Sequence, residues 1–326
     1  MILPVVLFLV FGGLGVAFAF ALVRSERARR EELAALFADT AHRVGARFVP
    51  GETGFFKSRS PSVVLNQHDT QVVADTYVVS SGKSSTTYSR VAAAYSLDRG
   101  PVLHIRRQGA LNSLGKMLGM QDIEIGDPIF DEAYMIKAPS AGAVLRVLGD
   151  DHRLALLHQL PGWWIKSDGV TVKLERFGYP DSAGELAQAM RVATAIASAD
   201  KRILDLAAAH PDARSEGGGV VFDASGAKGR FSVEEHECVL RVQNDQGGPP
   251  FGLDCEAPDA AERLPEGALE PALIAQLAAI GEGRLVRDAH QAWVSWWVAP
   301  DADQIEAAWR VLVGVAAPST RVGAFR

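Results

Sequence analysis

The sequence repeats one order of secondary-structure patterns, and this order constrains the fold more than any other feature. Segments in which apolar and polar residues alternate precede helical patterns, a hairpin and a longer helix, and the same succession returns in the second half. Alternation with period two is typical of half-buried strands, and apolar residues three and four apart are typical of amphipathic helices. Runs of strands followed by helices predict the α+β class. We therefore expect two antiparallel-sheet-plus-helix domains, which an internal duplication would explain.

In the first half, alternating segments rich in Val, Thr and Tyr predict an antiparallel meander. These segments lie near residues 62–66, 70–80, 85–97 and 101–107. The next patterns predict a short helix near 109–119, a strand near 131–138, and helices near 140–148 and 151–159. A hairpin over residues 163–177 follows, because Asp168-Gly169 supplies a two-residue turn between alternating runs.

A long helix then begins near Ser182, where Glu185 stands three residues later as in a capping box. The second half repeats the outline of the first. Strands are expected near 219–224, 228–234, 238–243 and 251–256, a helix near 269–280, a strand pair over 284–299 and a last helix over 302–316. We infer that the long helix joins the two domains.

The N-terminal segment is different, because residues Ile2–Val23 carry no charged side chain. As a helix the segment would extend about 33 Å, at about 1.5 Å per residue, and a bilayer core is about 30 Å thick. A cleaved signal peptide is the alternative, because Ala17-Phe18-Ala19 resembles a cleavage site. No basic residue precedes the apolar run, however, and the run is longer than the hydrophobic region of a signal peptide. We therefore expect a transmembrane helix that anchors the chain in a lipid bilayer.

Four arginines follow this segment within residues 24–30, and none precedes it. The positive-inside rule then places the C-terminal body in the cytoplasm and the anchor in a bacterial inner membrane. The two cysteines, Cys238 and Cys255, agree with a reducing compartment. Small residues recur every four positions in the apolar run and can form a helix–helix interface, so a homodimer or another protein is a candidate partner.

These patterns divide the chain into consecutive parts. They are a transmembrane anchor (1–23), an amphipathic juxtamembrane helix that Pro50-Gly51 ends (24–50), a first α+β domain (51–181), a connecting long helix (182–210) and a second α+β domain (211–326). The formal net charge is −6. Because nucleic-acid binders usually carry a clustered basic surface, this mildly acidic balance predicts no nucleic-acid partner.

Two local patterns resemble known sites without meeting their spacing. Gly82-Lys83-Ser84 resembles the end of a P-loop, but Tyr77 stands where a P-loop requires glycine, so we expect a hairpin turn. His236, Cys238, Cys255 and His290 could form a Cys2His2 zinc set, but the chain has no C-x2-C pair. We therefore expect buried free thiols, no metal and no cofactor.

The most acidic stretch holds the candidate binding residues Asp122, Glu124, Asp127 and Asp131. Carboxylates this dense could bind a hard cation or perform acid–base chemistry. Their spacing is not that of an EF-hand, and no nucleophile is identifiable beside them. The other interpretation is that they cap turns, helices or strands, with Phe130 as a core residue.

Residues 88–177 resemble a DUF3137-like family of uncharacterised bacterial proteins. The resemblance rests on GMQDIEIGDPIFD at 119–131, YMIK at 134–137 and VLRVL at 144–148. Members of this family are often predicted to carry membrane helices, so the resemblance implies an anchor here too. It implies no activity and no catalytic residues.

The sequence therefore favours a single-pass membrane protein whose α+β body binds a partner or ligand without catalysis. The chain has no G-x-S-x-G, H-E-x-x-H or C-x-x-C motif. One alternative is a metal-assisted hydrolase that uses the acidic stretch at residues 122–132. The other is a structural component of a membrane assembly.

Overall fold

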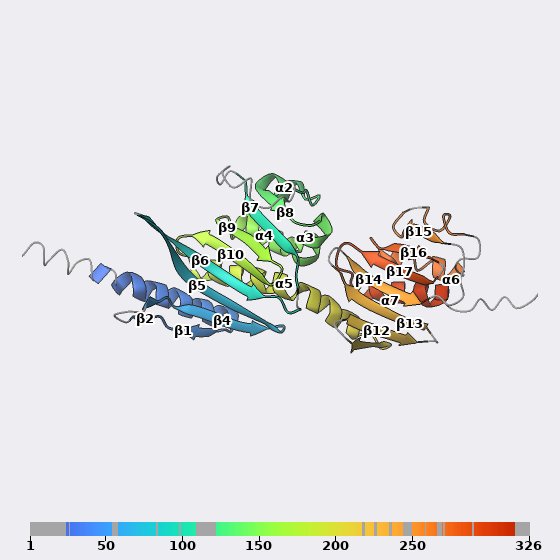
Figure 1. The fold of residues 1–326 in the computed structure, drawn as a ribbon, viewed down its shortest axis with the longest axis horizontal. Helices are drawn as coiled ribbons and strands as arrows, with labels where there is room; N and C mark the ends of the chain where they lie inside the picture. The colour runs from blue at the N-terminus through green and yellow to red at the C-terminus, as the bar shows by residue number, and fades with distance from the viewer. Residues whose placement is uncertain are drawn as a thin grey trace, which may run out of the picture.

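The computed structural model is α+β, with two large antiparallel sheets. It describes residues 24–25, 27–53, 58–82, 84–97, 99–108, 122–216, 219–224, 227–234, 237–243, 250–257, 259–265, 269, 271–288 and 290–316. Figure 1 shows the sheets side by side along the longest axis, joined by one long helix.

The expected transmembrane helix is corrected by the structure. Within the described ranges, no helix is long and apolar enough to cross a membrane. The predicted anchor at residues 1–23 lies outside these ranges. The first described helix, α1 (27–44), is amphipathic, and it buries Phe37 and Ala41 in the core of the first sheet.

The first sheet has eight strands in the order β1-β4-β5-β6-β10-β9-β7-β8. Every neighbouring pair is antiparallel. In this order the strands are Arg47–Val49, Ser62–Gln67, Thr70–Ser81, Ser84–Ala94, Thr171–Phe177, Trp163–Asp168, Val102–Arg107 and Tyr134–Lys137. A small separate sheet pairs β2 (Glu52–Thr53) with β3 (Ser58–Arg59).

The second sheet has seven strands in the order β11-β12-β13-β14-β17-β16-β15. In this order they are Ala213–Glu216, Gly219–Ala224, Ala227–Val233, Cys238–Gln243, Gln291–Trp296, Arg284–Arg287 and Phe251–Asp254. Each sheet begins with a four-stranded meander and continues with the two strands of a late hairpin, β10 and β9 in the first sheet and β17 and β16 in the second. The next strand comes from earlier in the chain than the hairpin: it is β7 in the first sheet and β15 in the second. The two sheets therefore share one topology, and only β8 extends the first beyond it.

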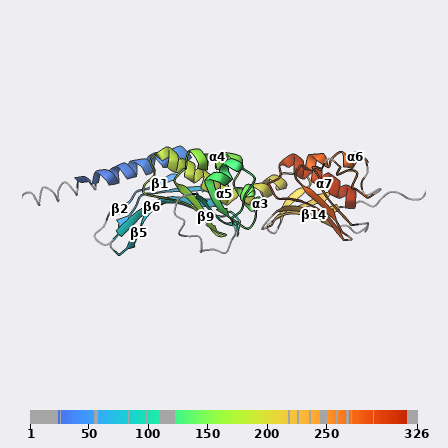
Figure 2. The same ribbon diagram turned by 90° about the horizontal axis from the view of Figure 1, so that it is seen from above.

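The helices occupy equivalent places in the two halves. Between β7 and β9, outside β8, the chain forms α2 (Pro128–Ala133), α3 (Ala141–Val147) and α4 (Asp150–His158), and between β15 and β16 it forms α6 (Pro271–Ile274) and η2 (Ala278–Ile280). A longer helix follows each hairpin: α5 (Ala183–Ala208) in the first half and α7 (Ala302–Ala316) in the second. Figure 2 shows the helices gathered on one side of both sheets.

Helix α5 belongs to both halves. Its 26 residues extend about 39 Å at about 1.5 Å per residue. Leu186 and Met190 in its N-terminal part are buried in the core of the first sheet, and Ile203 and Leu204 in its C-terminal part are buried in the core of the second. The helix thus completes the core of the first half. In the second half it occupies the position that α1 occupies in the first.

The local sequence explains why α5 is long and buried. Ser182 caps it by accepting a hydrogen bond from the Glu185 backbone N–H at 3.1 Å, and the Glu185 carboxylate accepts one from the Asp181 N–H at 2.6 Å. All residues from 192 to 200 are buried, as expected for a helix that is covered on every side. The buried hydroxyls of Thr194 and Ser198 donate to the carbonyl four residues earlier, at 2.8 and 2.7 Å.

Two segments differ from the sequence expectation, and a third is not among the described residues. The juxtamembrane helix ends at residue 44 because Gly45, with φ of +65°, turns the chain, and residues 47–49 form β1. The strand expected near 131–138 begins only at Tyr134, because Asp127 caps α2 and Pro128 opens it. The helix expected near 109–119 lies outside the described residues.

The buried part of α5 predicts a large difference between two leucines on the same helix. Leu186 is fully buried in the core, whereas Leu206 is 38% exposed. We expect Leu186→Ala to lower the free energy of unfolding by about 2–5 kcal/mol, and Leu206→Ala to lower it by less than about 1 kcal/mol. Urea denaturation followed by circular dichroism measures both, and equal effects would contradict the assigned burial.

Candidate functional site

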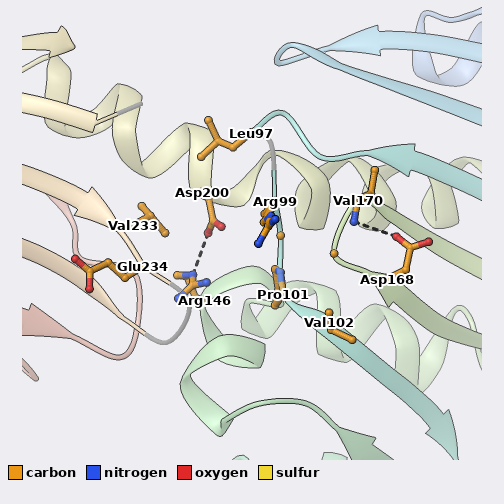
Figure 3. A pocket seen from close by; sticks show the side chains of 12 residues that line it. Leu97, Arg99, Pro101, Val102, Arg146, Asp168, Val170, Asp200, Val233 and Glu234 are labelled. Carbon is orange, nitrogen blue, oxygen red and sulfur yellow. Dashed lines mark hydrogen bonds and ion pairs between the residues drawn. The ribbon is translucent and has the colours of Figure 1, made fainter. Parts of the chain in front are cut away.

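A cleft of about 530 Å³ opens where the two halves of the chain meet. The segment between β6 and β7 forms one part of its wall, and the turn between β9 and β10 forms another. Helices α3 and α5 contribute Arg146 and Asp200, and Val233 and Glu234 come from the second half at the end of β13. Figure 3 shows these side chains converging from both halves.

A buried ion pair lies in this cleft. The Arg146 Nε donates to the Asp200 Oδ1 at 2.9 Å, and the two side chains are 2% and 11% exposed. Burial raises the pKa of the Asp200 carboxyl above its ordinary value, and the Arg146 guanidinium acts in the opposite direction. The pair therefore brings one positive and one negative group to the place where α3 approaches the middle of α5.

The wall formed by residues 95–97 and 99–101 is held by hydrogen bonds on two sides. The Ser96 N–H donates to the Ala197 carbonyl of α5 at 3.0 Å, and the Gly100 N–H donates to the Gly169 carbonyl of the hairpin turn at 2.9 Å. The Ser167 hydroxyl donates to the Pro101 carbonyl at 2.7 Å. These bonds fix the wall relative to both the helix and the hairpin.

The turn between β9 and β10 presents an ionised carboxylate. Asp168 Oδ1 accepts hydrogen bonds from the backbone N–H groups of Thr171 at 2.8 Å and Val170 at 3.0 Å. These two bonds lower the pKa of Asp168. Gly169 makes the turn possible because its φ is +87°.

The second half closes the other side of the cleft. Glu234 lies at the end of β13 and binds the Arg241 guanidinium, with Nη2 at 3.2 Å. This hydrogen bond lowers the pKa of Glu234. Cys238 is buried beside this region, and burial raises the pKa of its thiol to about 12, so it is a thiol at neutral pH.

Two of the residues singled out in the acidic stretch, Asp127 and Asp131, have separate hydrogen-bond partners. Asp127 Oδ1 accepts from the Phe130 N–H at 3.1 Å, and its Oδ2 binds Arg153 Nε at 3.0 Å. The Asp131 carboxylate accepts from the N–H groups of Ile125 and Gly126, each at 3.1 Å. Both carboxylates therefore cap local backbone around α2.

The other two acidic residues lie apart from this capping arrangement. Asp122 is 3.8 Å from Lys137 Nζ at the strand β8, and Glu124 is exposed. Among the residues that the structure describes, no group of three His, Cys, Asp or Glu side chains could hold a metal ion. The four carboxylates do not converge on one point, so they lack the geometry that a metal-assisted hydrolase requires.

The other sequence patterns also have local explanations. Residues 81–84 connect β5 to β6, and Gly82 has φ of +58°, as a hairpin turn requires. Cys255, like Cys238, is a free buried cysteine, and burial raises the pKa of its thiol to about 12. His236 lies outside the described residues.

The sequence interpretation missed Arg146 and Asp200. Arg146 is the charged residue of an otherwise apolar helical segment, Ala141–Leu148, and Asp200 directly follows an uncharged run of the helix, residues 192–199. A charge in the apolar part of a buried helix needs a partner, because an unpaired buried charge is very costly. That signal could have identified the pair, although it could not have shown which residues meet.

Comparisons with known proteins add no identification. No family model matches the chain, and neither a curated protein nor a solved structure is similar to it. The resemblance of residues 88–177 to the DUF3137-like family therefore stays a prediction.

The buried pair predicts a marked dependence of stability on both partners. We expect Arg146→Met to lower the free energy of unfolding by about 3–5 kcal/mol, because Asp200 stays buried without its cation. The double variant Arg146→Met/Asp200→Leu should recover most of this loss, since neither charge is then buried. Urea denaturation at pH 7 measures the cycle.

The same variants differ in their pH dependence. A carboxyl whose pKa is raised in the folded state favours folding below its unfolded pKa and loses that contribution as the pH rises. Stability of Arg146→Met should therefore fall as the pH rises from about 4, more steeply than that of the double variant. Parallel pH profiles would contradict the assigned burial of Asp200.

Proposed function

We propose that this chain is a ligand-binding protein that takes a small zwitterionic ligand in the cleft between its two halves, without catalysis. The observation that carries this proposal is the cleft itself, lined by charged side chains from both halves around the buried Arg146–Asp200 pair. Its volume of about 530 Å³ falls in the range of small-molecule sites, which is about 300–1,000 Å³ and often lies between domains.

Charges of both signs in the lining support a ligand that carries both. Arg99 and Arg146 are cationic, and Asp168, Asp200 and Glu234 are acidic. Arg146 and Asp200 bind each other, and Glu234 binds Arg241. Exposed Arg99 and exposed Asp168 are therefore the charges best placed to meet a ligand carboxylate and a ligand amine.

The composition of the lining supports binding rather than covalent chemistry. None of the described residues that line the cleft is a Ser, Cys, His or Lys. Covalent catalysis needs an activated nucleophile with a base in reach. The nearby Cys238 thiol is buried and protonated, which removes it from this role.

The proposal predicts that filling the cleft abolishes binding. Val102 lines the cleft and is 37% exposed, so Val102→Trp should occlude it without entering the core. Val78→Trp is the matched control, because Val78 is 59% exposed on β5 and does not line the cleft. The probes are the twenty common amino acids and a set of dipeptides, tested by thermal unfolding and calorimetry.

A ligand present at about 100 times its Kd stabilises the folded state by about 2.7 kcal/mol, which raises Tm by several degrees. We expect such a shift for the wild type and Val78→Trp, a loss in Val102→Trp and a weakened shift in Arg99→Ala. Equal shifts in Val102→Trp and the control would contradict the site. No shift with any probe would contradict the zwitterionic class of ligand.

A further inference from the structure

The first sheet has one face that no described element covers. Helices lie on the opposite face (Figure 2), where Val172 and Leu174 of β10 are buried. Lys173 and Glu175 alternate with them and therefore point to the uncovered face. The same alternation places Trp164 and Lys166 of β9 on that face, because Trp163 and Ile165 are buried.

A row of basic side chains crosses four neighbouring strands on this uncovered face. Lys173 of β10 lies opposite Lys166 of β9, Lys166 lies opposite His104 of β7, and His104 lies opposite Lys137 of β8. Side chains directly opposite in an antiparallel pair have Cβ atoms about 4.5–5.5 Å apart, and like charges there destabilise the sheet. Asp122 lies 3.8 Å from the Lys137 Nζ, so the like-charged pair that a bound anion would stabilise is Lys166 with Lys173.

The groups around His104 lower its pKa. Burial lowers the pKa of this imidazole first, and the positive charges of Lys166, Arg106 and Lys137 lower it further. Arg106 stands two residues from His104 on β7 and so shares its face. The imidazole is thus neutral at pH 7 and adds no charge to the row, and the Glu175 carboxylate acts on its pKa in the opposite direction.

Beside the basic row, four aromatic rings form a platform on the same face. Tyr77 stacks on Tyr88 with ring centroids 5.2 Å apart, and Phe177 lies 5.1 Å from Tyr88 and 5.0 Å from Trp164. The Phe177 side chain is 52% exposed. The aromatic platform therefore offers ring faces next to a row of cations.

The polar groups of the platform satisfy one another. Glu175 accepts from the Tyr77 hydroxyl at 2.9 Å and from Trp164 Nε1 at 3.3 Å. Arg90 and Asp75 form two hydrogen bonds, at 2.9 and 2.6 Å. These bonds hold the rings in place on the face that Lys166 and Lys173 share with Asp168.

We propose that the uncovered face of the first sheet binds a single-stranded nucleic acid. Phosphates would lie along the basic row, and bases would stack on Phe177 and Trp164. Cations that follow the backbone, together with aromatic rings that stack on bases, are the combination by which proteins bind single strands. A duplex fits this face less well, because its bases already stack on one another. The net charge of −6 is a sum over the whole chain, so it does not describe this local patch.

This surface adjoins the cleft, because Asp168 lies on the same face of β9 as Lys166, and it is tested with its own probe and variants. The probe is a fluorescein-labelled single-stranded oligonucleotide of mixed sequence, titrated with the full chain and followed by fluorescence anisotropy at several salt concentrations. The test variants are Lys166→Glu/Lys173→Glu and Phe177→Ala. The matched control is Arg214→Glu/Arg263→Glu, which changes the charge equally at two exposed arginines of the second half.

We expect the lysine double variant to weaken binding at least tenfold and the control to weaken it by less than threefold. Because two phosphate contacts are lost, the slope of log affinity against log salt should become shallower by about 1.4. Phe177→Ala should weaken binding about tenfold by removing one stacking partner. Circular dichroism melting establishes that each variant is folded.

Several results would overturn this proposal. They are no binding of the oligonucleotide, equal affinities of the lysine double variant and the control, or a matched duplex that binds as tightly as the single strand. If polyglutamate displaces the labelled oligonucleotide at a lower concentration of negative charges than the unlabelled oligonucleotide requires, the partner is an acidic polypeptide instead.

Discussion

The burial of α5 by both halves is the constraint on which the rest of the structure depends. Leu186 and Met190 are buried in the core of the first sheet, Ile203 and Leu204 in that of the second, and residues 192–200 between them are all buried. Neither half alone would cover this helix. Because one rigid helix enters two cores, the halves meet at its middle, where Asp200 binds Arg146 and the cleft opens.

The shared topology of the two sheets explains where the two proposed binding surfaces lie. In each half the helices cover one side of the sheet, as Figure 2 shows, so the cores form there and the other side is left to other interactions. In the first half that side carries Lys166, Lys173 and a set of aromatic rings. The cleft, in contrast, needs both halves, because its lining includes Asp168 from one and Glu234 from the other.

Much of the architecture could be predicted from sequence because it depends on local patterns. Alternation located most strands, Asp168-Gly169 located the hairpin turn, and the helix at 302–316 was placed at its observed bounds.

Contacts between distant segments could not be predicted in this way. Arg146 and Asp200 are 54 residues apart, and nothing in either local pattern selects its partner. The basic row could not be predicted for the same reason, because strand order alone brings its residues together: Lys137, His104, Lys166 and Lys173. The apolar run at 1–23, which was predicted to cross a membrane, lies outside the residues that the structure describes, and no helix within those residues is long and apolar enough to do so.

Native-state hydrogen exchange along α5 tests the shared helix most directly. If both cores hold it, amides from Val192 to Ile203 should be as strongly protected as those beside Leu186, and destabilising one sheet should lower protection throughout the helix. Rapid exchange confined to the middle of α5, with each end protected independently, would show two separately folded halves and would contradict this description of the molecule.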